Sequence, residues 1–494
     1  MKHGDHSSLR SESEPRCNDG TLGDASLRLM INEVGSYQQY GALDDENSIL
    51  SPGWKEVMTA KEVPRGSSKA SIFNLVSTIL GGGALSLPYA FACTGLGSGV
   101  VLLLMMSLAS TYSARLLLSC AYKTKQRSYQ DIAKVLYGPK GGTCVNFLVF
   151  LLVSLACVGY IVLMGDLLTS LLPPIFPGNS QIDINNNRVA IMGSCILVIY
   201  PVTLFRDLSA LRVTSFVSVL ATIILAGCVI DKSISELNNS NAVPDPIPSR
   251  MDTCVTELLP HQSKLECIEW IRFDWDFFLA IPILSCAYMC HFNVLPVHKE
   301  LRNSTQKRMN CVINATMGCS AALYLVIAVF GYLSKMQSLL GKEGGNILNM
   351  FSKHDPAITV GRIGLAATLL LSFPLLTHPC RTLLEEMLFD KFWAPSQLRN
   401  WFVSTFVSVS CYLLAILIPT ITVVWTIMGS TVAQVVAYVL PAAFYLKLVD
   451  GPVTSKQKFP ALVMLMLGSI SSVVCTIASF WNAISPGSLS GKGS

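Results

Sequence analysis

Long apolar runs separated by short polar segments recur along most of this chain. Read in windows of about 20 apolar residues, the length that crosses the hydrocarbon core of a bilayer, the pattern predicts eleven membrane-spanning helices. We expect them near residues 70–93, 97–122, 144–172, 189–205, 212–231, 277–297, 311–333, 359–379, 401–418, 421–446 and 459–482. The pattern therefore indicates an all-α polytopic membrane protein.

Composition agrees with this prediction. The 494 residues are 51% hydrophobic and 14% charged, and the mean hydropathy of +0.50 is too high for a soluble domain of this length. Residues 1–65 are rich in Ser, Asp, Glu, Asn and Gly and lack the apolar core of a cleavable signal. We expect a disordered cytosolic tail at 1–65, an eleven-helix domain at 66–485 and a short C-terminal tail at 486–494.

Lys and Arg gather in the loops that follow the even-numbered spans. These residues lie at 123–140, 206, 299–308, 381–399 and 447–458, whereas the short loops after spans one and nine carry none. Because basic loops stay on the cytosolic side, we expect a cytosolic N-terminus and a C-terminus across the membrane. The net charge of +5 follows from this bias, so no nucleic-acid partner is expected.

The loop at 232–273 is then luminal or extracellular. It contains Cys254 and Cys267, which we expect to form a disulfide on the oxidising side, with two free thiols as the alternative. Asn238 begins a glycosylation sequon on the same side.

Two of the predicted spans contain helix-breaking residues at membrane depth. The first holds Gly81, Gly82 and Gly83 before Pro88, and the sixth holds polar residues, His291 among them, before Pro296. Backbone groups freed there find no water, so such breaks persist only beside protein, a cavity or a ligand. Each break opens a block of five spans, as in transporters with inverted repeats. The second block must insert upside down, and span eleven stands outside the repeat.

Two segments between spans fit the same symmetry. Residues 129–137 place apolar side chains on one helical face after Ser128 and Asp131, which are spaced as a capping box. Residues 346–351 form a short apolar turn in the matching position of the second block. The alternative is two unrelated interfacial helices.

These motifs resemble the amino acid/auxin permease family. The resemblance rests on Phe73-Asn-Leu, Gly81-Gly-Gly83, Leu87-Pro-Tyr89 and Thr94-Gly95 in the first span, on Cys290-His291, Val294-Leu-Pro296 and Glu300-Leu301 in the sixth, and on Pro374, Pro379 and Arg381 in the eighth. Within that family the chain is most similar to sodium-coupled neutral amino acid transporters and vacuolar exporters. The resemblance implies a LeuT-type five-plus-five inverted repeat, alternating access, and an amino acid carried with Na⁺ or H⁺.

The breaks supply the groups that an amino acid needs. N–H groups of Gly81, Gly82, Gly83 and Ala84 can bind its carboxylate, as the start of a helix binds an anion. Carbonyls freed around Ser285, Cys286, Ala287 and Tyr288 can accept from its ammonium. Neither break carries a strongly placed acidic or basic side chain, so we expect a neutral substrate. The alternative for the glycines is tight helix packing.

The coupling ion is left open between Na⁺ and H⁺, and no organic cofactor is expected. The resemblance implies that Ser77 and Ser372 match positions that help to coordinate Na⁺, although the expected Asn of the first helix is missing. Among the few titratable groups inside the spans, His291 lies at the second break and is our candidate for pH sensing or proton transfer. Asp166 and His378 are the others. A structural, hydrogen-bonded His291 is the alternative.

Our leading hypothesis is therefore a secondary active transporter of neutral amino acids, expected to act as a monomer in contact with membrane lipid. The alternative is an amino acid sensor that signals through residues 1–65. A membrane enzyme would need paired catalytic groups, and Cys290, His291 and His298 inside a transport-like motif do not make one. Tyr40–Leu43 and Asp45–Leu50 resemble sorting signals read by adaptors. They favour a lysosomal or vacuolar membrane, with the plasma membrane as the alternative.

Overall fold

The computed structural model describes residues 66–172, 181–204, 212–238, 268–341, 345–353, 355–389, 397–452 and 455–484. All of these lie in one compact unit, residues 64–494. Within the described ranges the elements are helical, apart from one isolated β-bridge between Gly66 and Leu301, and the all-α prediction is confirmed. Cys254, Cys267, both sorting motifs and the C-terminal tail lie outside these ranges. Asn238 ends helix α8, and its side chain is not described.

The first predicted span is interrupted, as expected. Helix α3 (Ser68–Ile79) begins at Ser67, whose hydroxyl accepts from the N–H of Ala70 at 3.2 Å. After Gly81 the chain continues as the 3₁₀ helix η2 (Gly82–Ser86) and then as α4 (Leu87–Thr94), with Pro88 in the first turn of α4. The two halves are bent by 46°. Glycine supplies the backbone freedom at the bend, and proline suits the first turn of the new helix.

The sixth predicted span is also split in two. Helix α10 (Phe277–Ala287) ends at Tyr288, and α11 (His291–Glu300) begins after Cys290. The break therefore lies at residues 288–290, upstream of Pro296, which sits inside α11.

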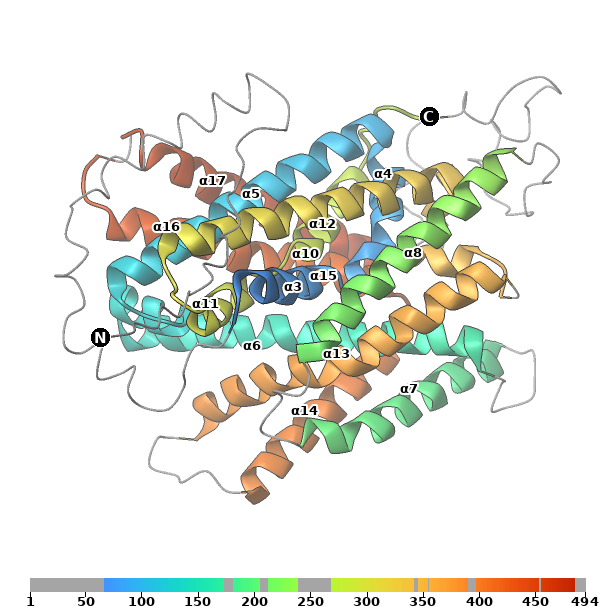
Figure 1. The fold of residues 1–494 in the computed structure, drawn as a ribbon, viewed down its shortest axis with the longest axis horizontal. Helices are drawn as coiled ribbons and strands as arrows, with labels where there is room; N and C mark the ends of the chain where they lie inside the picture. The colour runs from blue at the N-terminus through green and yellow to red at the C-terminus, as the bar shows by residue number, and fades with distance from the viewer. Residues whose placement is uncertain are drawn as a thin grey trace, which may run out of the picture. The chain divides into compact units, whose positions relative to one another are not determined.

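Other helices surround these two interrupted ones (Figure 1). In chain order they are α5 (Leu96–Thr124), α6 (Tyr129–Leu171), α7 (Gln181–Thr203), α8 (Arg212–Asn238), α12 (Gln306–Lys335), η5 (Met336–Leu340), η6 (Ile347–Met350), α13 (Pro356–Leu388), α14 (Gln397–Leu417), α15 (Ile421–Met428), the π-helical turns η7 (Gly429–Ala433) and η8 (Val435–Val439), α16 (Leu440–Leu448) and α17 (Phe459–Ile484).

A helix lies at every expected span, but the number eleven is not confirmed. Nine helices in the described ranges are long and apolar enough to cross a membrane, and the bent pair at the first break makes ten. Helix α7 occupies the fourth expected span and is not among them. Its first turns carry Asp183, Asn185, Asn187 and Arg188, which lower its hydropathy.

The amphipathic segment before the third span is confirmed as the first part of α6. The Ser128 hydroxyl accepts from the Asp131 N–H at 3.2 Å and donates to the Asp131 carboxylate at 2.6 Å. Gly138, with φ of 77°, and Pro139 then kink the helix before it continues to Leu171. The counterpart at 346–351 is the short helix η6, which begins where Asn346 Oδ1 accepts from the Leu348 N–H at 3.1 Å.

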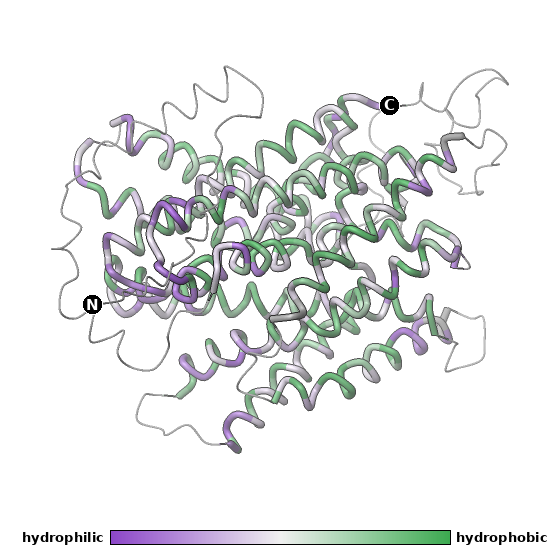
Figure 2. Tube along the Cα trace, viewed as in Figure 1, coloured by the Kyte–Doolittle hydropathy of each residue, from purple (hydrophilic) through white to green (hydrophobic). Residues whose placement is uncertain are grey.

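The packing follows the apolar pattern of the sequence. Helix α13 packs against α6 and α8, while α12 packs against α3, α4, α5 and α8. Figure 2 shows hydrophobic residues along the middle of the helices and hydrophilic ones toward their ends. Large apolar side chains are exposed on α14 and α17, including Leu414, Leu417, Leu467 and Ile470. An outward apolar belt of this kind suits contact with lipid.

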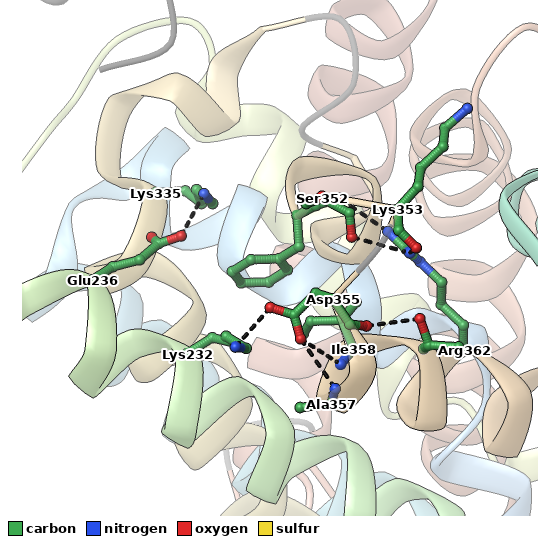
Figure 3. Close-up of polar contacts among 11 residues, drawn as sticks. Lys232, Glu236, Lys335, Ser352, Lys353, Asp355, Ala357, Ile358 and Arg362 are labelled. Carbon is green, nitrogen blue, oxygen red and sulfur yellow. Dashed lines mark hydrogen bonds and ion pairs between the residues drawn. The ribbon is translucent and has the colours of Figure 1, made fainter. Parts of the chain in front are cut away.

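Ion pairs tie α8, α12 and the start of α13 together (Figure 3). Lys335 Nζ lies 2.7 Å from Glu236 Oε1, and Lys232 Nζ lies 2.6 Å from Asp355 Oδ2. The same Asp355 caps α13, because its Oδ1 accepts from the N–H groups of Ala357 and Ile358 at 3.0 and 3.2 Å.

Candidate functional site

The two interrupted helices meet at their breaks. A Cβ built on Gly83 would lie 3.3 Å from the Ala287 Cα, so the backbones of η2 and α10 are in near contact. Gly81 through Ala84 are all buried, and so are Ala287 and Tyr288. The structure thus brings together the two predicted binding segments, Gly81–Ala84 and Ser285–Tyr288.

The N–H groups at the first break are not equivalent. The Gly81 N–H donates to the Ile79 carbonyl at 2.7 Å, and the Ala84 N–H donates to the Gly81 carbonyl at 3.3 Å. Gly82 and Gly83 are the first residues of η2, and the first N–H groups of a helix have no partner within it. Of the four predicted residues, Gly82 and Gly83 are therefore best placed to meet an anion.

Side chains from two other helices press on the glycines. A Cβ on Gly81 would lie 2.7 Å from the Tyr160 hydroxyl oxygen. A Cβ on Gly82 would lie 2.5 Å from Leu163 Cδ2 and 3.2 Å from Trp425 Cζ2. A side chain larger than that of glycine at either position would have to displace these neighbours. The sequence analysis missed Tyr160, Leu163 and Trp425, since nothing in an apolar span separates a wall residue from a core residue.

The carbonyl side of the site involves a tyrosine that the sequence analysis also missed. The Tyr324 hydroxyl donates to the Ile79 carbonyl over 2.5 Å and lies 3.0 Å from the Ala287 carbonyl oxygen. Ser285 donates its hydroxyl to the Ile281 carbonyl at 2.9 Å, within its own helix. Because its proton is used within the helix, the Ser285 hydroxyl can meet a ligand only as an acceptor, as the freed backbone carbonyls of α10 also can.

His291 is fully buried at the start of α11. Its ring packs edge-on against Tyr438, with the centroids 6.1 Å apart, and the Tyr438 hydroxyl pairs with Ser110 at 2.9 Å. Neither imidazole nitrogen has a side-chain hydrogen-bond partner in the described part of the chain. The predicted proton candidate thus lies among hydroxyl groups from α5 and η8.

Asp166 forms a polar contact between helices and lies three residues after Leu163 on α6. Its Oδ1 is 2.9 Å from Arg188 Nε, which joins α6 to α7, and Arg188 also donates to the Ile418 carbonyl at 3.2 Å. These contacts agree with a helix-pairing role.

The two predicted sodium ligands lie on separate helices. Ser77 is on α3, where its hydroxyl donates to the Asn74 carbonyl at 2.9 Å, and Ser372 is half-buried on α13. One turn of α3 is also tied to the second interrupted helix, because Asn293 Nδ2 donates to Thr78 Oγ1 at 2.9 Å.

Comparison with known proteins gives a consistent result. Residues 64–485 match the family described as "Transmembrane amino acid transporter protein". The "Putative sodium-coupled neutral amino acid transporter 11" of Bos taurus is 25% identical over 434 residues, covering 87% of this chain and 86% of the relative. Its counterpart from Mus musculus is 24% identical over 421 residues, covering 85% and 86%.

A solved structure shares the fold. The structure of MhsT in complex with L-phenylalanine superposes with a TM-score of 0.55 at 14% sequence identity, covering 85% of this chain and 100% of that chain. The predicted architecture around two interrupted helices is confirmed at the level of the fold.

Proposed function

Because this chain belongs to the transmembrane amino acid transporter family, we propose that it is a secondary active transporter of neutral amino acids that works by alternating access. The family match agrees with the resemblance noted in the sequence motifs. The observation that carries the proposal is the near contact of Gly83 with Ala287, which joins the N–H groups of one break to the carbonyls of the other. A zwitterion needs both kinds of group at once.

In this proposal the substrate carboxylate binds the N–H groups of Gly82 and Gly83, and its ammonium binds carbonyls at the end of α10. The substrate side chain would pack near Tyr160, Leu163 and Trp425, which are uncharged. Binding a charged side chain there would leave its charge unpaired in an apolar site, at a high desolvation cost. This chemistry supports a neutral substrate.

The names of the relatives support Na⁺ as the coupling ion. Hydroxyl and carbonyl oxygens suit a hard cation, so Ser77 and Ser372 are the proposed side-chain ligands. The second candidate is H⁺ carried by His291, which its position at the second break beside the Tyr438–Ser110 hydroxyl pair supports. Uptake into proteoliposomes with separate Na⁺ and H⁺ gradients distinguishes them. If H⁺ couples, His291→Ala uptake should no longer respond to the pH gradient.

The site itself is tested by Gly83→Val. The new side chain must fit where even a Cβ lies 3.3 Å from the Ala287 backbone, so it should separate the breaks and reduce uptake of a labelled neutral amino acid to background. Gly318→Val is the matched control, because a Cβ on Gly318 meets nothing within 4 Å. Normal uptake by Gly83→Val would show that the substrate does not bind at the two breaks.

We further propose that the basic loops and the N-terminus face the cytosol, and that the 232–273 loop carries a glycan on Asn238 and the Cys254–Cys267 disulfide. Loss of an electrophoretic mobility shift in Asn238→Gln after expression in eukaryotic cells would report the glycan. Microscopy of the tagged full chain would distinguish a lysosomal or vacuolar membrane from the plasma membrane.

A further inference from the structure

The side chain of one tyrosine, Tyr324, lies between the ends of α3 and α10, the first halves of the two interrupted helices. Tyr324, fully buried on α12, places its hydroxyl oxygen 2.5 Å from the Ile79 carbonyl oxygen and 3.0 Å from that of Ala287. Ile79 is the last residue of α3 and Ala287 the last residue of α10. One side chain from a third, unbroken helix therefore touches both broken ends.

The hydroxyl cannot satisfy both carbonyls, because it has only one proton to donate. We assign that proton to the shorter contact, the one to Ile79. Ile79 also accepts the Gly81 N–H at 2.7 Å, so both lone pairs of its carbonyl are engaged. The Tyr324 oxygen and the Ala287 carbonyl oxygen then face each other as two acceptors 3.0 Å apart.

Two acceptors in near contact repel unless a proton donor or a cation joins them. The surroundings exclude bulk water: Gly83 packs on the Ala287 backbone, and the Tyr288 ring lies edge-on to Tyr324 with centroids 5.4 Å apart. A positively charged group could contact both oxygens and complete the arrangement.

We propose that Tyr324 is a positioning residue of the transport cycle, whose hydroxyl holds the end of α3 and whose oxygen, with the Ala287 carbonyl, receives a positively charged group. This inference rests on the proposed function. The group is either the substrate ammonium or a monovalent coupling cation, because both bind neutral oxygens in the same way. Tyr324 belongs to neither break, so it also couples the position of α3 to the occupancy of the α10 end.

The test is Tyr324→Phe, which removes the hydroxyl and keeps the ring. Tyr412→Phe is the matched control, because Tyr412 likewise donates from one helix to a backbone carbonyl of another, that of Val189 at 3.2 Å, in a different part of the structure. Both variants and the unaltered protein are reconstituted, and uptake of a labelled neutral amino acid is measured against amino acid and against Na⁺ or H⁺ concentration.

We expect Tyr324→Phe to weaken one affinity about tenfold or more, the usual effect of losing a hydrogen bond to a charged group. A raised KM for the amino acid with an unchanged half-saturating cation concentration assigns the site to the ammonium. The reverse pattern assigns it to the cation. If neither value changes relative to Tyr412→Phe, Tyr324 only fills space and the inference is wrong.

A second measurement covers a Tyr324→Phe protein that does not assemble. With the unaltered protein, labelled uptake is inhibited either by the unlabelled amino acid or by its N,N-dimethyl derivative. The derivative retains the charge but loses two N–H donors. Equal inhibition by the two compounds would overturn the assignment to the ammonium. If this inhibition is also the same at every Na⁺ and H⁺ concentration, the assignment to the coupling cation is overturned as well. Absence of uptake by the folded, unaltered protein under either gradient would instead refute the proposed function.

Discussion

Arg362 offers the sharpest test of what holds the short helix η6, which contacts η2 at the first break. Its side chain is 1% exposed on α13, and its guanidinium donates to the carbonyls of Leu348 at 2.7 Å and Phe351 at 3.0 Å, with longer contacts to Ser352 at 3.3 Å and Lys353 at 3.5 Å (Figure 3). The four carbonyls lie in and just after η6. One buried cation thus satisfies a turn that has few helical hydrogen bonds of its own.

The magnitude follows from the two short contacts. Each hydrogen bond to a charged group contributes roughly 1.5–3 kcal/mol, and removing the cost of burying the guanidinium offsets part of the sum. We expect Arg362→Met to lower the free energy of local opening by about 3 kcal/mol, which is about a 100-fold change in an equilibrium constant. Because exchange follows local opening, amides of η6 should exchange about 100-fold faster.

Hydrogen–deuterium exchange of the protein in lipid nanodiscs measures this directly. The Leu348 and Asn349 N–H groups are suitable reporters, because they donate to Asn346 Oδ1 and O at 3.1 and 2.9 Å. Lys353→Met is the control, since its exposed side chain has no part in the Arg362 contacts. Unchanged exchange at η6 in folded Arg362→Met, or equal acceleration throughout the protein, would refute the reasoning.

Two further predictions concern ion pairs. Burial acts to raise the pKa of Asp355, but the hydrogen bond from Lys232 and the helix N–H groups outweigh it and hold that pKa below its usual value. Such a carboxylate stabilises the fold above its unfolded pKa, and this contribution is lost as pH falls through the folded pKa. The unfolding temperature in detergent should therefore decline below about pH 4, and Lys232→Met should show a smaller decline; an identical decline would contradict the pairing. Asp166→Asn should lower the unfolding temperature, because Arg188 loses its charged partner, while the response of uptake to a pH gradient stays unchanged. A lost response would make Asp166 part of the coupling.

The two breaks show how far sequence reasoning reaches. Three adjacent glycines located the first break closely, because glycine favours a bend in the backbone and leaves room for the close neighbours of Gly81–Gly83. The prolines were poorer markers of position. Pro88 lies in the first turn of α4 and Pro296 lies inside α11, so each follows its break rather than forming it. The capping box at Ser128 was predicted because its hydrogen bonds join residues three apart.

Contacts between distant segments escaped the sequence analysis. Tyr324 is one of two buried tyrosines in the largely apolar helix α12, and its role depends on carbonyls 245 and 37 residues away. The π-helical turns of η7 and η8 are similar, because their carbonyls take hydrogen bonds from other helices. The Tyr129 hydroxyl donates to the Val436 carbonyl at 3.1 Å, Ser472 donates to the Ser430 carbonyl at 2.6 Å, and Ser113 donates to that of Ala437. Such partners are set by the tertiary fold.

The two halves of the first interrupted helix are unequally buried: four of the 12 residues of α3 are buried, whereas all 8 residues of α4 are. At its start, α3 is tied by backbone bonds from Gly66 N to the Glu300 carbonyl at 3.1 Å and from Arg302 N to the Gly66 carbonyl at 2.9 Å. Each such bond contributes only about 1 kcal/mol net.

The other half is anchored through buried groups. Ser86, at the end of η2, donates to the Gly345 carbonyl at 2.6 Å, in the segment that leads into the turn held by Arg362. Because α3 buries a smaller share of its residues than α4 does, we expect a swing of α3 about Gly81 to cost less than moving η2 and α4 away from their neighbours. Such a swing would draw the Ile79 carbonyl away from Tyr324, so in this mechanism the movement that opens one side of the carrier also breaks the hydrogen bond across the two helix ends.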